Sequence, residues 1–426
     1  MSARGATLPE PAAQSDSDDA LQQIVVRCMD CGATDTGAVA LTSCASCGGL
    51  LDVVVPLGNR VSPADIGVGV PDTARHSGVW RYWPLLPHLP ASAIVSAWEG
   101  NTPLYRDDRL ARFAGLPAGH LELKHEGMNP TGSFKDRGMT VGVSHARAIG
   151  ARIVACASTG NTSASLAAYA SAAGMPSLVL VPEGKISGGK LAQTIAYGAT
   201  VVQIAGDFDA ALSLLRLLTA KYDVYLVNSV NPARLQGQKT AAFEVVDFLG
   251  DAPDFHLLPV GNAGNIAAYW LGWSEYAAAG RATKRPVIRG FQAAGAAPLV
   301  EGAPVANPET KATAIRIGNP ASWKLAEAAR DESGGRFAKV SDEQILAAQA
   351  ELARRDGVFV EPASAAGVAG LLQELAAGES YAGTTVVITV TGHGLKDTAT
   401  ALEGKAALDT VIDAEVDAAA AAAGLI

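Results

Sequence analysis

The residue best suited to covalent chemistry is Lys135, which stands near the start of a predicted helix. It ends a run of turn-forming residues, Asn129-Pro-Thr-Gly-Ser-Phe-Lys135, that leads directly into helical sequence. The apolar neighbour Phe134 and the positive end of the helix dipole both lower the pKa of an amine. A less protonated amine can attack a carbonyl. The segment therefore predicts a Schiff-base lysine, and the alternative is one of the solvated surface lysines that most proteins carry.

A second run of small polar residues, Ala157-Ser-Thr-Gly-Asn-Thr-Ser-Ala164, follows a strand-like run and precedes a predicted helix, Ala164 to Ala173. Backbone N–H groups and hydroxyls at a helix start can bind an anion such as a substrate carboxylate. Asn161 can also hydrogen-bond a ring hydroxyl. An ordinary Ser/Thr-rich helix cap is the alternative interpretation.

Two glycine-containing turns complete the set. Pro259-Val-Gly-Asn-Ala-Gly-Asn265 stands between a strand and a helix, and its small residues let backbone amides approach a phosphate. It lacks the third glycine of a dinucleotide-binding loop, which favours a cofactor with one phosphate over NAD. Thr391-Gly-His-Gly-Leu395 follows the last strand-like run and can direct the Thr391 hydroxyl at a bound ring.

Four of the five cysteines form two close pairs, each followed by glycine: Cys28-Met-Asp-Cys31 and Cys44-Ala-Ser-Cys47. Two such pairs bring four thiolates into a tetrahedral shell, which leaves no open position for water and is therefore typical of structural zinc. The alternatives are ligands that no longer hold a metal, or a redox pair. None of these interpretations makes the segment catalytic.

The elements that must position these groups alternate between β-branched runs and Ala-rich amphipathic segments. That alternation predicts an α/β fold with parallel sheets, whose functional loops lie at the carboxyl ends of the strands. The predicted strands are Ile153 to Ala155, Ser177 to Val181, Thr200 to Ile204, Val224 to Val227, His256 to Pro259, Val287 to Gln292 and Thr384 to Thr391.

Composition excludes several classes of protein. A net charge of −9 and a pI near 5.3 give no basic surface for nucleic acid. No uninterrupted apolar run reaches the length of about 20 residues that a membrane span needs. The first residues show no apolar core flanked by basic residues, so we expect no signal peptide and a cytoplasmic protein.

With these motifs in view, the chain from about Gly100 to Asp397 resembles the pyridoxal phosphate (PLP)-dependent threonine synthases. Further matching runs are Glu99-Gly-Asn-Thr-Pro103, Asn228-Ser-Val-Asn-Pro-Ala-Arg234, Gly237-Gln-Lys-Thr-Ala241 and Glu361-Pro-Ala-Ser-Ala365. The resemblance implies PLP fold type II, the tryptophan-synthase-β-like fold, in which two parallel-sheet α/β domains enclose the active site. It also implies a homodimer, and some relatives carry a similar cysteine ribbon.

The expected organisation has six parts. They are a disordered leader (1–22), a zinc-ribbon-like segment (23–58), an arm or linker (59–98), a large PLP domain (99–140 and 231–410), a small PLP domain (141–230) and a C-terminal tail (411–426).

The resemblance also assigns roles to residues. Lys135 would carry PLP, Asn161 would contact the ring 3-hydroxyl, and Thr391 would meet the pyridine nitrogen. The phosphate of PLP would bind at Gly261, Asn262, Ala263, Gly264 and Asn265. The substrate would bind to Ser158, Thr159 and Thr162, with Thr162 also acting in catalysis. Asn228 and Arg234 would grip the substrate phosphate.

The implied reaction is γ-elimination of phosphate from O-phospho-L-homoserine followed by β-addition of water, which yields L-threonine, with Lys135 as proton shuttle. Two departures leave the substrate open: His393 replaces an Asn of many bacterial relatives, and the loop Ile186 to Lys190 is unusually glycine-rich. A related enzyme acting on O-phosphoserine, such as a cysteate synthase, is therefore the main alternative.

Two more distant alternatives remain. Gly184-Lys-Ile-Ser-Gly-Gly-Lys-Leu191 fits most of a nucleotide-binding P-loop, but Leu191 stands where Ser or Thr must bind magnesium. A ribbon-bearing interaction module without activity is disfavoured because Lys135, Asn161, the glycine loop and Thr391 are all present.

Overall fold

The computed structural model describes residues 21–37, 43–55, 61–183, 188–206, 208–403 and 411–425. Most of the predicted leader lies outside these residues, as do residues 184–187 of the P-loop-like run Gly184 to Leu191. Leu21, within the predicted leader, is buried in one cluster with Ile24 and Val26. No helix within the described ranges is both long and apolar enough to cross a membrane.

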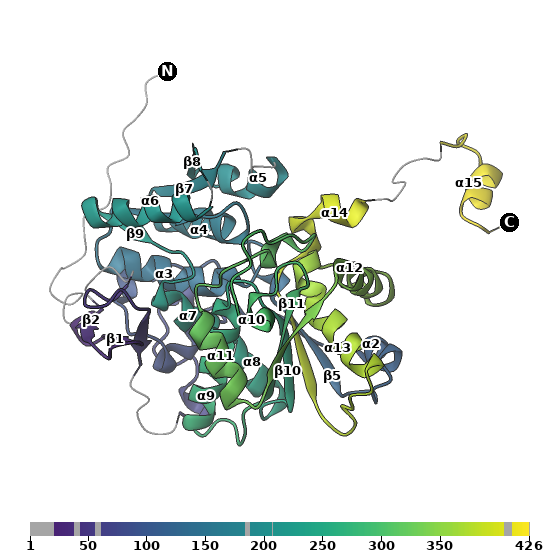
Figure 1. Ribbon diagram of the computed structural model, residues 1–426, viewed down its shortest axis with the longest axis horizontal. Helices are drawn as coiled ribbons and strands as arrows, with labels where there is room; N and C mark the ends of the chain where they lie inside the picture. The colour runs from purple at the N-terminus through teal and green to yellow at the C-terminus, as the bar shows by residue number, and fades with distance from the viewer. Residues whose placement is uncertain are drawn as a thin grey trace.

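The smaller of the two main sheets has four parallel strands in the order β8-β7-β6-β9. The strands are β6 (Ile153–Ala157), β7 (Ser177–Pro182), β8 (Thr200–Ile204) and β9 (Val224–Leu226), and each lies on a predicted strand run. Helices α4 (Asn161–Ala173), α5 (Gly188–Ala196) and α6 (Phe208–Lys221) connect them. This unit forms the upper part of the molecule in Figure 1, and it falls within residues 141–230.

The larger sheet has six strands in the order β12-β11-β10-β13-β5-β4, all parallel except the edge strand β4. They are β4 (Leu104–Arg106), β5 (Leu121–His125), β10 (Phe255–Pro259), β11 (Val287–Ala293), β12 (Arg336–Val340) and β13 (Val386–Val390). The sequence predicted β10, β11 and β13 but not β4, β5 or β12.

Both faces of the larger sheet are covered by helices, as its continuous apolar strands require. Leu257 and Ile388 pack in one core, whereas their neighbours Leu258 and Val387 pack in the core on the other face. The first face carries α2 (Asp108–Phe113), α12 (Asp342–Glu351) and α13 (Ala366–Ala376). The second carries α8 (Thr240–Leu249), α9 (Gly264–Ala278) and α11 (Trp323–Glu332). Three shorter helices are α10 (Pro298–Glu301), α14 (Thr398–Leu402) and α15 (Val416–Ala422).

Helices α3 (Lys135–Ala148) and α7 (Pro232–Gln238) pack closely against each other. Glycine makes this approach possible: a Cβ on Gly237 would lie 1.8 Å from the carbonyl oxygen of Arg137. The side chain of Asn231 caps α7 by accepting a hydrogen bond from Ala233 N, and Pro232 fits the first helical position. As a result, the residues of α3 and α7 are held in a fixed relation.

The cysteine segment forms an antiparallel sheet of three strands, β1 (Val25–Cys28), β2 (Thr34–Thr36) and β3 (Leu51–Val54). Three of the hydrogen bonds that attach it to the main body are Gln236 Nε2 to Val53 O at 2.9 Å, His145 Nε2 with Gly37 O at 2.8 Å, and Lys324 Nζ on α11 to Asp30 Oδ1 at 2.6 Å. The ribbon is thus docked on α7, α3 and α11.

The segment predicted as an arm or linker is well packed in its described part, residues 61–98. It forms four short 3-10 helices: η1 (Pro63–Asp65), η2 (Asp72–Ala74), η3 (Trp80–Leu85) and η4 (Ala91–Ala93). Trp80 is fully buried, and its Nε1 donates to Thr140 Oγ1 on α3 at 2.8 Å. The segment therefore belongs to the core rather than to a free connection.

Candidate active site

Lys135 is the first residue of α3, as its sequence context predicts. Its Nζ lies 4.0 Å from the centre of the Phe134 ring. The side chain is half-buried, but the protein around the amine removes enough water to lower its pKa to about 7. The positive charge of Arg234 lowers the pKa further, and the negative charge of Glu361 opposes this effect. An amine of this kind is largely available for attack near neutral pH.

The loop between β6 and α4 carries the predicted substrate and ring contacts. Helix α4 begins at Asn161, three residues before the predicted start, so Asn161 and Thr162 occupy its first turn. Ser158, Thr159, Asn161 and Thr162 are all half-buried, and their side chains therefore remain accessible to a ligand. An N-terminus with exposed N–H groups and hydroxyls suits a carboxylate.

The glycine loop connects β10 to α9, which begins at Gly264. Asn262 anchors this loop, because its Nδ2 donates to Ser229 Oγ at 2.5 Å and its Oδ1 accepts from Ala321 N at 2.6 Å. Asn265 Nδ2 is buried and has no hydrogen-bond partner in the part of the chain described. A buried donor without a partner is costly, so a phosphate at this helix start would satisfy it.

Thr391 follows β13 and is held by a serine that the sequence interpretation did not assign. Ser364 Oγ lies 2.9 Å from Thr391 Oγ1 and accepts hydrogen bonds from Thr391 N at 3.1 Å and Gly392 N at 2.7 Å. The Lys135 loop meets the same point, since Phe134 N donates to Thr391 O at 3.1 Å. Thr391 and the start of α3 are thus brought together.

Arg234 lies on α7 and is only 1% exposed. Its Nη1 donates to Val227 O at 3.0 Å, whereas Nε and Nη2 have no partner among the described residues. Burial lowers the pKa of this guanidinium to about 10. Two free donors on a buried cation indicate a site for an anion.

Asn228, the other residue predicted to bind the substrate phosphate, is hydrogen-bonded to the protein backbone. Its Oδ1 accepts from Ala157 N and its Nδ2 donates to Ala157 O, both at 3.0 Å. These bonds fix the end of β6 to the chain after β9. One N–H of the amide remains for a ligand.

Glu361 is a second residue that the sequence interpretation did not assign. It is 6% exposed, and its Oε1 accepts a hydrogen bond from Asn161 Nδ2 at 2.9 Å. Burial raises the pKa of Glu361 to about 7, although the nearby charges of Lys396 and Lys135 lower it. Glu361 and Ser364 both stand in the run Glu361 to Ala365 that supported the resemblance, which was the available signal. Ser229, beside Asn228, was overlooked in the same way.

These groups fit PLP. The lysine can bind its aldehyde, the glycine loop with the unpartnered Asn265 can bind its phosphate, and Asn161 and Thr391 are polar groups suited to its ring. Of these groups, Asn265 Nδ2 is the buried donor that has no partner among the described residues.

The four predicted metal ligands also come together. The sulfur atoms of Cys28, Cys31, Cys44 and Cys47 all lie within 4.8 Å of one another. Such a four-sulfur set has the composition and size of a structural zinc site. Cys156 is separate and lies fully buried in β6.

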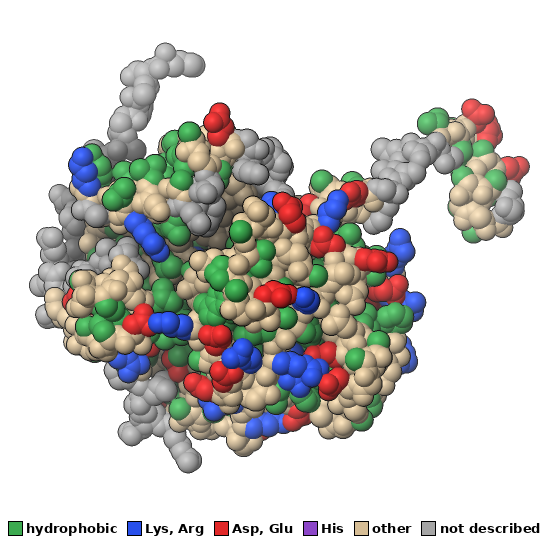
Figure 2. All heavy atoms as spheres, in the orientation of Figure 1, with side chains coloured by type: hydrophobic (Ala, Val, Ile, Leu, Met, Phe, Trp, Pro, Cys, Tyr) green, Lys and Arg blue, Asp and Glu red, His purple; other side chains and the backbone are tan. Residues whose placement is uncertain are grey.

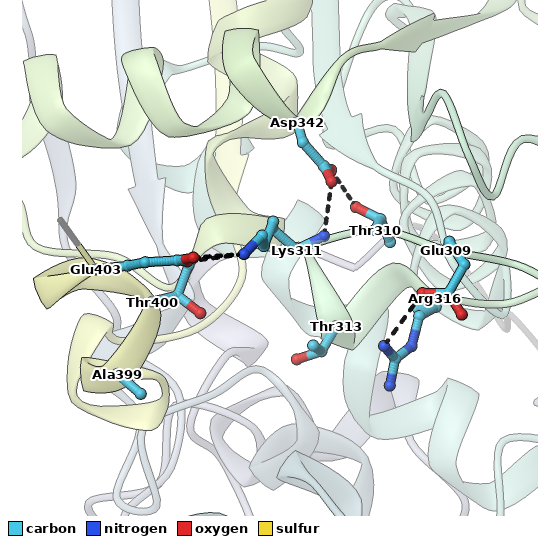
Figure 3. A pocket seen from close by; sticks show the side chains of 9 residues that line it. All are labelled: Glu309, Thr310, Lys311, Thr313, Arg316, Asp342, Ala399, Thr400 and Glu403. Atoms are coloured by element: carbon cyan, nitrogen blue, oxygen red, sulfur yellow. Dashed lines mark hydrogen bonds and ion pairs between the residues drawn. The ribbon is translucent and has the colours of Figure 1, made fainter.

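A cavity of about 500 Å³ lies apart from these residues, between the segment 309–316 and α14. Figure 3 shows that its charged side chains pair with one another: Lys311 with Glu403 at 2.7 Å, and Arg316 with Glu309 at 4.0 Å. None of the predicted site residues lines it. On the face drawn in Figure 2, acidic and basic side chains are likewise interspersed.

Comparisons with known proteins agree with this geometry. Residues 95–392 match the family described as "Pyridoxal-phosphate dependent enzyme". A threonine synthase of Mycobacterium bovis is 56% identical over 339 residues, which cover 78% of this chain and 93% of that protein. One from Methanosarcina acetivorans is 47% identical over 403 residues, covering 92% and 97% respectively.

Solved structures share the fold at low identity. Maize serine racemase superimposes with a TM-score of 0.59 at 20% identity and covers 69% of this chain and 88% of its own. A threonine deaminase of Solanum lycopersicum gives a TM-score of 0.61 at 21% identity, with 74% and 88% covered. The chain therefore belongs to the pyridoxal-phosphate dependent enzymes of fold type II and, within them, to the threonine synthases.

Proposed function

We propose that this protein forms L-threonine from O-phospho-L-homoserine with PLP bound at Lys135. The observation that carries the proposal is the half-buried Lys135 together with the buried Arg234. One offers an amine with a pKa near 7, and the other offers two unpartnered donors to an anion. The reaction removes phosphate from Cγ and adds water at Cβ.

Lys135, Asn161, Thr391 and the loop Gly261 to Asn265 would hold PLP, which supplies an electron sink for proton removal at Cα. Ser158, Thr159 and Thr162 would bind the substrate carboxylate at the start of α4. The Thr391 hydroxyl, oriented by Ser364, is neutral and does not stabilise a positive charge on a pyridine nitrogen as a carboxylate would.

The amine of Lys135 would remove the proton at Cα and then the one at Cβ, with Thr162 nearby as a hydroxyl that can take part. A pKa of about 7 suits this role because the group both accepts and returns a proton near neutral pH. Arg234 would stabilise the charge that develops on the departing phosphate. Asn228 would contribute its remaining N–H to the same phosphate.

Three further assignments accompany this function. The four cysteines would hold one structural zinc, since their sulfur atoms form a compact set. The protein would act as a homodimer in the cytoplasm, as the resemblance favours.

The test measures phosphate release and threonine formation by the purified protein from O-phospho-L-homoserine, with O-phosphoserine assayed in parallel. We expect threonine only from the first substrate. Lys135→Ala should abolish it, and the exposed Lys339→Ala should behave as the parent protein. Bound PLP without threonine, together with phosphate release from O-phosphoserine, would instead support the cysteate-synthase alternative.

A further inference from the structure

Glu361 lies at the junction of the two α/β units. It precedes η8 (Pro362–Ala365), and its backbone N donates to Gly392 O at 3.0 Å. Its carboxyl group packs directly on Gly392, where an added Cβ would lie 2.3 Å from Glu361 Oε1. The carboxylate is therefore held in one place beside Thr391.

From this place Glu361 reaches across to the smaller unit. Its Oε1 accepts the hydrogen bond from Asn161 Nδ2 at 2.9 Å, between residues 200 positions apart in the chain. A carboxylate only accepts hydrogen bonds, so it selects the NH₂ side of the Asn161 amide. The second N–H of that NH₂ group is then available to a ring hydroxyl.

The charged groups around Glu361 come from α3 and from η9 with the residue after it. Lys135 lies on α3, and Lys396 lies on η9 (Gly394–Lys396) with Asp397 just after it. Lys396 Nζ also donates to Thr131 O at 2.9 Å and to Gln193 Oε1 on α5. The two lysines favour the ionised carboxylate, whereas burial and Asp397 disfavour it.

We propose that Glu361 is a positioning residue for the PLP reaction: its carboxylate orients Asn161 and places a negative charge beside Lys135. The inference rests on the proposed function. The charge keeps the cofactor-bearing nitrogen protonated to higher pH, and the oriented amide supports the ring hydroxyl. Glu361 itself is not required to touch the substrate.

The test is a pH titration of the visible absorbance of the purified holoenzyme, together with its affinity for added PLP. Glu361→Gln keeps the shape and removes the charge. We expect its absorbance midpoint to move about one unit to lower pH. Glu361→Asp keeps the charge but is too short to reach Asn161, so its midpoint should stay near that of the parent. Its PLP affinity should fall about 5- to 10-fold through loss of one hydrogen bond.

Glu374→Gln is the matched control, because Glu374 is also buried but pairs with Arg336 at 2.7 Å rather than with a site residue. It should leave both readings unchanged. Unaltered midpoint and affinity in both Glu361 variants would overturn the inference. If the parent protein binds no PLP, the proposed function fails instead. If Glu361→Gln does not fold, the affinity of Glu361→Asp decides.

Discussion

Two groups of charged residues, each with one member on α3, differ in how their charges are paired. The first, here called the charge network, consists of Lys124, Glu126, Arg137 and Glu244. Arg137 donates to Glu126 through Nε at 2.6 Å and to Glu244 through Nη2 at 2.7 Å, and Lys124 donates to Glu244 at 2.6 Å. Every charge in this network faces an opposite charge.

The second group, the site charges, consists of Lys135, Arg234 and Glu361. Here burial, and to a smaller extent the charge of Arg234, lower the pKa of Lys135, and Arg234 keeps two donors without a partner among the described residues. Taking a charge out of water costs several kcal/mol unless it is paired. The comparison teaches that complete pairing marks the scaffold, whereas incomplete pairing marks the place where a ligand belongs.

Substitution of Arg137, which pairs with both carboxylates of the charge network, should have the largest effect on stability. Arg137→Met would leave Glu126 and Glu244 buried without their main partner and should lower the free energy of unfolding by about 3–5 kcal/mol. Lys135→Met, two residues earlier, should leave the free energy of unfolding of the PLP-free protein unchanged or higher. Urea unfolding of both variants measures this. Equal losses in the two would refute the distinction between network and site.

The site charges themselves are tested at Arg234. Arg234→Met should raise KM for O-phospho-L-homoserine about 100-fold, because two charge-assisted hydrogen bonds to phosphate are lost. The free energy of unfolding should change by less than about 1 kcal/mol, since no carboxylate loses its partner. Steady-state kinetics and urea unfolding give the two values. A large loss of stability with unchanged KM would place Arg234 in the scaffold.

This contrast also explains what the sequence could and could not predict. Lys135, the glycine loop and Thr391 could be proposed from the sequence because each stands in a local pattern of turn residues beside a predicted strand or helix start. Glu361 was not assigned, because its role depends on a hydrogen bond to Asn161 that spans 200 positions. Arg137 was not singled out either, since its partner Glu244 lies 107 positions away.

Fold predictions followed the same division. Most of the predicted strands are apolar runs that contain β-branched residues, whereas β4 has only three residues and β12, Arg-Phe-Ala-Lys-Val, is mixed and mostly half-buried. The segment 59–98 was interpreted as a linker because short 3-10 turns give no helical periodicity. Its burial, as of Trp80 against α3, comes from tertiary contacts.

The charge network and the site charges also differ in how their contributions to stability depend on pH. The paired Glu244 has its pKa lowered to about 2, so its contribution to stability is present above its ordinary value of 4.5 and is lost as the pH falls from there toward 2. Glu361 has its pKa raised to about 7, so its contribution is present below 4.5 and is lost as the pH rises through 7.

Without PLP, the parent protein should therefore lose about 1–3 kcal/mol of unfolding free energy relative to Glu361→Gln between pH 5 and pH 8. Urea unfolding at both values measures the difference. A difference that does not vary with pH would mean that Glu361 titrates as an ordinary exposed carboxylate. Glu374→Gln, which removes a buried but ion-paired carboxylate, provides the comparison at the same two pH values.

The cysteine ribbon is a third group of polar side chains, four thiols without an opposite charge beside them. Changes to these cysteines should have the smallest effect on catalysis. Four sulfur atoms within 4.8 Å should bind one zinc per chain, and Cys44→Ser or a chelator should remove it. The turnover number should change less than about twofold, because the ribbon meets the body through Val53, Gly37 and Asp30, whose partners are not predicted site residues. Metal analysis, thermal unfolding and the absorbance of bound PLP test this, with Cys156→Ser as the control that retains zinc.

Loss of PLP absorbance on zinc removal would show that the ribbon supports the site through α7, since Gln236 lies two residues from Arg234. Loss of thermal stability with unchanged PLP absorbance would show that the ribbon has a structural role only. Its thiols would then need a metal, as the site charges need a substrate and a cofactor.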